Sequence, residues 1–252
     1  AIRTALARAV RIIVSHPAII EHSPWLAAVR AKCRVVAYGV DAEAWSALPP
    51  AERPAVAALR AEKPRLVVAV GRLVPYKGFD VLVEAFAAVS GQLVIVGEGP
   101  ERPRLSALIA ALGLSGRVEL AGRLHQPALR RLLHAARVFA FPSVSAAEAF
   151  GIAQLEAMAA GLPVVNTALP TAVPWVARDG QEAVTVPPAD AGALAIALSA
   201  LLDDAPRAAA LGAAGRERVR TVFTEARYCA GVLSVWQEAL QAAAVSPGGE
   251  TA

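Results

Sequence analysis

The feature that most constrains the fold of this chain is a series of short segments without any polar residue, separated by stretches long enough for helices. Three such segments lie at 66–70, 93–96 and 138–141. A strand that is apolar throughout is buried on both faces, and parallel strands need connections of helix length. The sequence therefore predicts an α/β fold, a Rossmann-like parallel sheet with helices on both faces. Ligands bind such sheets at the carboxyl ends of the strands.

The remaining elements follow from apolar periodicity and from the positions of glycine and proline. Further strands are expected at 10–14, 35–37, 118–120 and 184–186, with one more beginning at Pro163. Helices are expected at 19–31, 79–89, 104–112, 127–136, 190–202, 206–220 and 224–243. Residues 244–252 are expected to form a frayed polar tail.

Composition argues against several classes of protein. Hydrophobic residues make up 56% of the chain, but glycines and prolines interrupt the longest uncharged run, 157–177, so we expect loops and a strand there rather than a membrane-spanning helix. The formal net charge of +4 suits an anionic ligand or an anionic membrane surface. No basic patch is interleaved with aromatic residues, so no nucleic acid partner is expected. Cys33 and Cys229 lack metal-binding or redox spacing, which favours the reducing cytoplasm.

Two carboxylates flank the start of one predicted helix. Glu148 precedes it, Gly151 begins it, and Glu156 lies inside it, where a carboxylate needs a hydrogen-bonding partner. The spacing predicts a buried apolar stripe of Ile152, Leu155 and Ala159. Gly151 is expected to let a ligand approach the backbone N–H groups, and Gly161 to end the helix. Taken alone, the spacing fits equally well a helix with one capping and one half-solvated glutamate.

A loop after the first apolar strand carries two cations. Arg72 and Lys77 follow Gly71 at the carboxyl end of the strand and precede a helix N-terminus. Two cations and a helix dipole are suited to holding a diphosphate, whereas a solvated turn with two basic residues is the alternative.

The glutamate pair resembles a known signature. The two glutamates are separated by seven residues, with Phe-Gly shortly after the first and the run Glu-Ala-Met-Ala-x-Gly-x-Pro-Val-Val beginning at the second. This pattern resembles the signature of retaining glycosyltransferases of the GT-B fold (family 4, glycosyl transferases group 1). More narrowly, they are similar to bacterial and archaeal hexosyl- and mannosyltransferases that use nucleoside-diphosphate sugars. The segment 166–176 resembles the corresponding loop of lipopolysaccharide mannosyltransferases. The implied reaction is transfer of a hexose, with mannose one candidate, to a glycan or glycolipid with retention.

The resemblance also implies roles for individual residues. The group expected to act in transfer is Glu148, Arg72 and Lys77. In the family Arg72 and Lys77 would hold the diphosphate, Glu148 the sugar hydroxyls and Glu156 the ribose hydroxyls. The loops after the next strands would line the base and ribose. The complete expected donor-binding set is Gly71, Arg72, Lys77, Gly97, Arg123, Leu124, Glu148, Phe150, Gly151, Ile152 and Glu156.

Some features are absent from the sequence or depart from the family pattern. There is no Asp-x-Asp and no pair of histidines at helical spacing, so neither a metal nor a cofactor is expected beside the nucleoside-diphosphate sugar donor. Ala172 and Ala183 stand where glycine is usual, and their Cβ atoms are expected to crowd the approach of the backbone to the ligand.

The resemblance divides the chain into four parts. We expect 1–41 to be the end of an N-terminal acceptor domain, 42–64 a linker, 65–222 the donor-binding domain, and 223–252 a closing helix with its tail. The closing helix is expected to pack back toward the N-terminal half. The resemblance implies that most of the acceptor domain lies outside this sequence, so the expected partners are a nucleotide sugar, a glycan or lipid-linked saccharide acceptor and the missing N-terminal domain. The expected location is the cytoplasm, including the inner face of the membrane.

Two other functions are consistent with the same residues. One is a nucleotide-sugar-binding half that has no catalytic activity without a partner chain. The other is a GT-B-like sugar-nucleotide epimerase, which would convert the donor without any acceptor.

Overall fold

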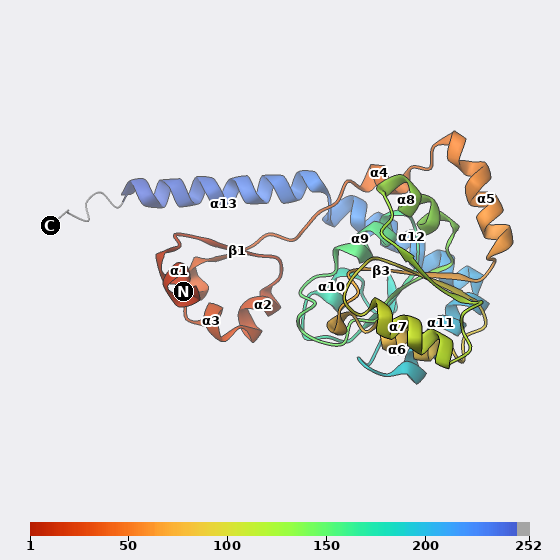
Figure 1. The fold of residues 1–252 in the computed structure, drawn as a ribbon. Coiled ribbons are helices and arrows are strands. Elements are labelled where there is room, and N and C mark those ends of the chain that lie inside the picture. The colour runs from red at the N-terminus through yellow and green to blue at the C-terminus, as the bar shows by residue number, and fades with distance from the viewer. Residues whose placement is uncertain (246–252) are drawn as a thin grey trace.

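A parallel six-stranded sheet forms the centre of the computed structural model, which describes residues 1–245 (Figure 1). Its strands are β3 (Leu66–Val70), β4 (Gln92–Val96), β5 (Val118–Gly122), β6 (Val138–Phe141), β7 (Val164–Thr167) and β8 (Ala183–Val186). They are ordered β5-β4-β3-β6-β7-β8, and every neighbouring pair is parallel. The predicted Rossmann-like sheet is therefore confirmed.

The strand order reverses between β3 and β6. From β3 the chain proceeds outward through β4 to β5, and then returns to the other side of β3 and proceeds through β7 to β8. At such a point the connections leaving two adjacent strands run to opposite faces of the sheet, which opens a crevice at their carboxyl ends. The fold thus places the loops after β3 and β6 next to each other.

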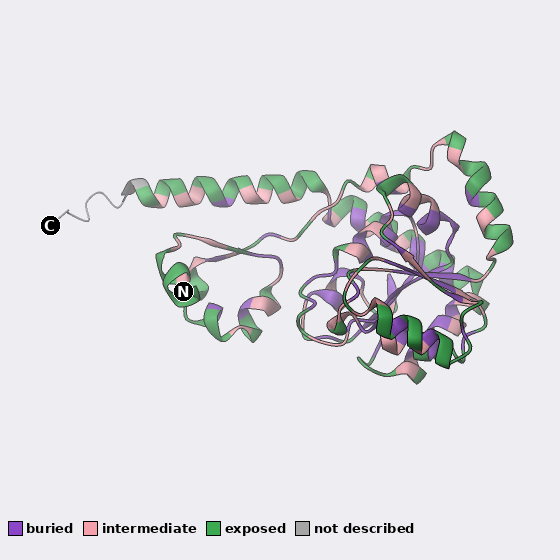
Figure 2. Cartoon of the chain, in the orientation of Figure 1, coloured by how far each residue is buried: buried purple, intermediate pink, exposed green. Residues whose placement is uncertain are grey.

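Helices cover both faces of the sheet because the strands bury alternate residues on each side. Leu66 and Val68 of β3 lie in one apolar core, and Val67 and Ala69 in the other. The first core is covered by α5 (Arg53–Glu62), α8 (Gln126–Ala135), α9 (Ile152–Ala159) and α10 (Val173–Val176). The second is covered by α6 (Phe79–Ala85), α7 (Arg102–Ala111) and α11 (Ala191–Asp203), and α12 (Ala205–Val222) contributes to both. Figure 2 shows this buried interior.

The N-terminal residues form a small separate lobe. Its two strands, β1 (Ile12–Val14) and β2 (Cys33–Val35), pair in parallel. Its helices are α1 (Ile2–Arg8), α2 (Pro17–His22), α3 (Pro24–Ala27) and the 3-10 turn η1 (Arg30–Lys32). The single helix expected at 19–31 was wrong, because Pro24 cannot continue α2 and instead starts a new helix after Ser23. The strand expected at 35–37 is shifted two residues earlier.

Residues 42–64 are packed against the sheet domain. They contain α4 (Ala42–Ser46), the 3-10 turn η2 (Pro50–Glu52) and α5. Trp45 and Val56 are buried in the core that contains Leu66, and Glu52 forms an ion pair with Arg130 of α8 at 2.8 Å. The segment is therefore fixed in place, while the proposed four-part division of the chain stays a prediction.

The long helix α13 (Glu225–Val245) extends away from the sheet domain and lies beside the N-terminal lobe (Figure 1). Glu238 pairs with Arg11 at 2.9 Å and also with Arg34, and Gly231 lies against Val36, where an added Cβ would come within 2.8 Å of a methyl group. The rest of the helix is largely exposed (Figure 2), and its exposed side chains include the large hydrophobic residues Leu233, Trp236 and Leu240. Most of the predicted tail, 246–252, lies outside the described residues. Within residues 1–245, no helix has the length and apolarity needed to cross a membrane.

Candidate functional site

An ion pair between Lys77 and Glu148 occupies the point where the strand order reverses. The ammonium Nζ lies 2.5 Å from Glu148 Oε2, and the two side chains are only 12% and 9% exposed. Lys77 ends the 3-10 turn η3 (Pro75–Lys77) after β3, whereas Glu148 lies in the loop after β6. Gly78 has φ of +64°, and a Cβ there would lie 2.2 Å from the Pro142 carbonyl oxygen. The glycine therefore allows the two loops to approach closely enough for the pair to form.

Two hydroxyl groups that the sequence analysis missed fix Glu148. Ser143 Oγ donates to Glu148 Oε2 at 2.9 Å, and Thr167 Oγ1 donates to the Ser143 carbonyl oxygen at 2.6 Å. All three residues are buried. Ser143 follows β6 and Thr167 ends β7, so the hydroxyl groups lie at the carboxyl edge of the sheet. A polar residue at the end of an apolar strand was the available signal.

Glycines join the loops after β3, β4 and β5. Gly97 has φ of +145°, and an added Cβ would lie 1.8 Å from the Gly71 carbonyl oxygen. The Gly71 amide donates to Val96 at 3.0 Å, and the Gly97 amide donates to Gly122 at 2.8 Å. Gly71 also leaves room for the Lys77 stem, since a Cβ would lie 3.3 Å from its Cε. Gly97 thus allows the loop after β4 to approach the loop after β3, and Gly71 leaves space for the side chain of Lys77.

Cationic side chains project from the same loops. Arg72 and Arg123 are exposed, and neither forms an ion pair within residues 1–245, while Leu124 is half-buried. They follow β3 and β5, two strands of one parallel sheet, so all three residues lie at its carboxyl edge. An anionic ligand at this edge would therefore find positive charge without displacing a carboxylate from Arg72 or Arg123.

The amino end of α9 offers unused hydrogen-bond donors beside Glu148. The amides of Phe150, Gly151 and Ile152 donate to no acceptor within the described part of the chain. Free N–H groups at a helix start carry partial positive charge and bind anions or hydroxyl oxygens. Gly151 has φ of +86°, and its Cβ would lie 2.8 Å from the Phe141 ring. Backbone conformation and Phe141 therefore both require a glycine here, and the expected approach of a ligand to its backbone stays a prediction.

The predicted buried stripe of α9 is only partly correct. Leu155 and Ala159 are buried, but Ile152 is 44% exposed, because it begins the helix at the open carboxyl edge of the sheet. Glu156, about one turn into α9, is half-buried, and its carboxyl group has no hydrogen-bond partner within residues 1–245. Burial raises the pKa of Glu156 from 4.5 to about 7. A ligand with hydroxyl groups would supply the partner that this carboxyl group lacks.

An aromatic cluster and a buried amide network hold the loop 168–177 against α9. Phe150 is buried and packs edge-on against Tyr38 and Trp175, with ring centroids 5.2 and 6.2 Å apart. Asn166 Nδ2 donates to Gln154 Oε1 at 3.0 Å and to the Ala177 carbonyl oxygen at 2.9 Å. The Phe150 side chain is thus structural, which leaves its backbone amide as the group available to a ligand.

The two alanines that depart from the family pattern do not crowd the site. Ala172 and Ala183 are both 0% exposed and lie in the apolar core. Their Cβ atoms therefore contact other side chains, so the expected clash with a bound ligand was wrong. Among the described residues, no group of three or more histidines, cysteines or carboxylates is arranged to hold a metal ion.

Comparison with known proteins shows the family to which this chain belongs. A family model described as "Glycosyl transferases group 1" matches residues 54–218, and the chain belongs to that family. The D-rhamnosyltransferase WbpZ of Pseudomonas aeruginosa is 32% identical over 218 residues, which cover 85% of this chain and 55% of that protein. A D-inositol 3-phosphate glycosyltransferase of Mycolicibacterium paratuberculosis is 36% identical over 199 residues, covering 76% and 44%. The chain spans about half the length of the curated relatives that it matches.

Solved structures share the fold. Sucrose-phosphate synthase from Thermosynechococcus elongatus aligns with a TM-score of 0.81 and 30% identity, over 97% of this chain and 61% of that one. HepE of Anabaena, solved in complex with UDP, aligns with a TM-score of 0.83 and 21% identity, over 94% and 66%. The structural neighbours are GT-B glycosyltransferases, as the sequence signature implies.

Proposed function

We propose that this chain is the donor-binding half of a retaining glycosyltransferase. The reaction would transfer a hexose, with mannose the first sugar to test, from a nucleoside-diphosphate sugar to a glycan or glycolipid. The observation that carries the proposal is the Lys77–Glu148 pair at the reversal of strand order, beside the free amides at the start of α9. The similarity to a rhamnosyltransferase and to an inositol-phosphate glycosyltransferase supports a sugar donor.

Each part of the site has a role in this reaction. The leaving diphosphate gains negative charge as the sugar–oxygen bond breaks, and Arg72, Lys77 and the α9 amides would stabilise that charge. Glu148, held by Ser143, would accept hydrogen bonds from sugar hydroxyls. The unpartnered Glu156 carboxyl would accept from the ribose. Lys77 has to turn from Glu148 to the diphosphate, or contact both, when the donor binds.

The acceptor would bind outside the sheet domain, in an N-terminal half of the enzyme. We propose that such a half, or a partner chain, completes the active enzyme, because this chain spans about half of those relatives. The positive loops would hold the diphosphate without a metal ion or a further cofactor. The enzyme would act in the cytoplasm, with lipid-linked acceptors reached from the inner face of the membrane.

Calorimetry with UDP-, GDP- and ADP-sugars tests donor binding directly. At least one sugar nucleotide should bind, and Arg72→Ala should weaken that binding by about 1.5–3 kcal/mol, the usual worth of a hydrogen bond to a charged group. Binding of the bare nucleoside should hardly change. Arg207→Ala, an exposed arginine on α12, is the matched control and should bind as the wild type does. Equal losses for nucleotide and nucleoside would contradict the assignment of Arg72 to the diphosphate.

A further inference from the structure

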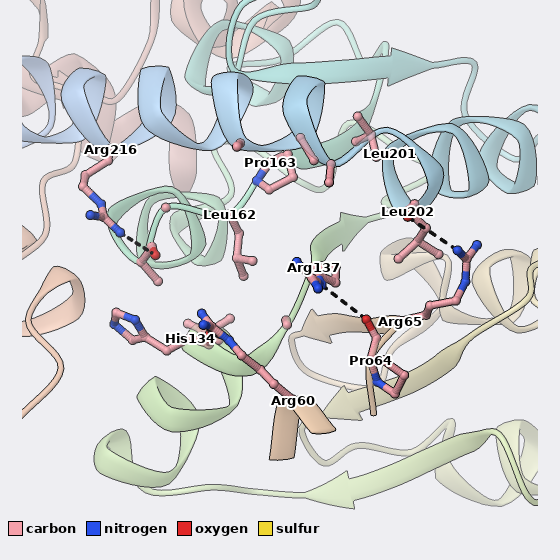
Figure 3. A pocket seen from close by; sticks show the side chains of 17 residues that line it. Arg60, Pro64, Arg65, His134, Arg137, Leu162, Pro163, Leu201, Leu202 and Arg216 are labelled. Carbon is pink, nitrogen blue, oxygen red and sulfur yellow. Dashed lines mark hydrogen bonds between the residues drawn. The ribbon is translucent and has the colours of Figure 1, made fainter. Parts of the chain in front are cut away.

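A cavity lies at the opposite edge of the sheet from the proposed donor site, and Figure 3 shows the residues that line it. Its volume is about 490 Å³, which is within the range of small-molecule sites. The lining includes Arg65, Arg137 and Pro163, which immediately precede β3, β6 and β7. These are the amino ends of the strands. The cavity is therefore distinct from the loops that carry Lys77 and Glu148, which follow the carboxyl ends.

Four arginines from different elements line this cavity. Arg60 comes from α5, Arg216 from α12, and Arg65 and Arg137 from the segments before β3 and β6 (Figure 3). Arg65 is neutralised by Asp203, at 2.8 Å. The other three have no carboxylate within 4 Å among residues 1–245. Three uncompensated positive charges thus surround one concave site.

Backbone carbonyl groups hold these guanidinium groups in place and leave donors over. Arg137 uses only Nε, which donates to Pro64 at 3.3 Å. Arg216 uses Nη2, which donates to Ala160 at 3.0 Å, and Arg60 donates twice to the His134 carbonyl oxygen, at 3.1 and 2.5 Å. The remaining N–H groups have no acceptor in the described chain. Guanidinium groups that are oriented in advance lose less entropy when they bind a phosphate.

The backbone at the end of α9 makes room for one of these cations. Gly161 has φ of +84°, and an added Cβ would lie 2.5 Å from Arg216 Nη2. The positive surroundings also affect His134, whose pKa is lowered by burial first and further by Arg216 and Arg60. The local field thus favours an anion over a further cation.

We propose that this cavity binds a soluble, phosphorylated small molecule at a site separate from the donor site. Phosphate oxygens match the paired N–H groups of arginine. The apolar part of the wall, from Leu133, Leu162 and Leu201, would cover the uncharged portion of the ligand. None of the large exposed hydrophobic residues of the described chain lines the cavity, so the cavity itself presents no side chain that would insert into a bilayer. This favours a soluble phosphate over a lipid headgroup.

Calorimetry with inorganic pyrophosphate tests the proposal on the full chain. Arg137→Gln with Arg216→Gln should lower the affinity about a hundredfold, since each removes a charge-assisted contact worth about tenfold. Arg137 is exposed, and the only hydrogen bond of its side chain within residues 1–245 goes to the Pro64 carbonyl oxygen. Arg137→Gln alone should therefore lower the affinity about tenfold and guards against a folding defect in the double variant. Arg207→Gln removes the same charge from α12 outside the cavity and should bind as the wild type does.

Pyrophosphate also fits the proposed donor site, and Arg72→Gln separates the two. The binding component that the double variant loses should persist in Arg72→Gln. If the wild type does not bind millimolar pyrophosphate, or if Arg72→Gln abolishes all binding while the double variant binds normally, the cavity is not a phosphate site. Sedimentation with phosphatidylcholine vesicles, with and without phosphatidic acid, tests the source. If the wild type sediments with the vesicles that contain phosphatidic acid and the double variant does not, the assignment to a soluble ligand is wrong.

Discussion

Replacing Glu156 by glutamine should stabilise the ligand-free protein at neutral and alkaline pH. Burial without a partner raises the pKa of the Glu156 carboxyl from 4.5 to about 7. Each pKa unit corresponds to about 1.4 kcal/mol, so the ionised carboxylate costs the folded state up to about 3 kcal/mol. Because the pKa is raised in the folded state, the stability is fully present below pH 4.5 and is lost as the pH rises to and beyond about 7. Glutamine keeps the shape and carries no charge, so it should not show this loss.

Urea unfolding of both proteins at pH 5 and at pH 8 measures the effect. At pH 5, just above the ordinary pKa of 4.5, Glu156→Gln should be more stable by less than about 1 kcal/mol, and at pH 8 by up to about 3 kcal/mol. Glu84→Gln on α6 is the control, because that glutamate is exposed, forms no ion pair within residues 1–245 and loses the same charge. If Glu156→Gln is no more stable than the wild type at pH 8, or if it changes stability equally at both pH values, the carboxyl group is not buried as described.

Two further predictions concern the framework of the site. Lys77→Met leaves the Glu148 carboxylate buried without its cation and should lower the free energy of unfolding by about 3–5 kcal/mol. The double variant Lys77→Met with Glu148→Gln should lose less stability than Lys77→Met alone. Chemical denaturation of the two single variants and the double variant measures this, and additive losses from the two single changes would contradict a direct ion pair. Gly97→Ala should lower the free energy of unfolding by at least about 2 kcal/mol, because the added Cβ would meet the Gly71 carbonyl oxygen. Gly113 is also at positive φ but faces open space, so Gly113→Ala should lower it by only about 1 kcal/mol. Equal melting temperatures for the two variants would refute the role of Gly97.

The sheet was predictable because its strands carry their own evidence. Strands buried on both faces must be apolar throughout, so their apolar runs locate them. The strand predicted at 138–141 matches β6, and the strand predicted at 93–96 misses one residue of β4. The order in which the strands pair, and its reversal between β3 and β6, then bring the loops that carry Lys77 and Glu148 to one edge of the sheet. The contact between the two side chains was not predictable, since it depends on Gly78 lying against the Pro142 carbonyl group.

The errors have equally local causes. Helical spacing groups Ile152 with Leu155, but spacing does not show that the helix begins at an uncovered edge of the sheet. Ser143 and Thr167 were missed because a single hydroxyl residue near the end of a strand is common in any sequence, and only the fold shows that Ser143 contacts Glu148 and that Thr167 holds Ser143. The arginine cavity was missed because Arg60, Arg137 and Arg216 are far apart in sequence and form no motif.

The most direct test of the proposed donor site compares two ligands on one variant. Glu148→Gln removes the carboxylate that would accept sugar hydroxyls and also releases Lys77 from its ion pair. By calorimetry, the variant should bind the sugar nucleotide more weakly than the wild type by about 1–3 kcal/mol, while it binds the plain nucleoside diphosphate at least as tightly. If the variant binds both ligands as the wild type does, Glu148 only caps and supports the fold, and the central claim about this site is wrong.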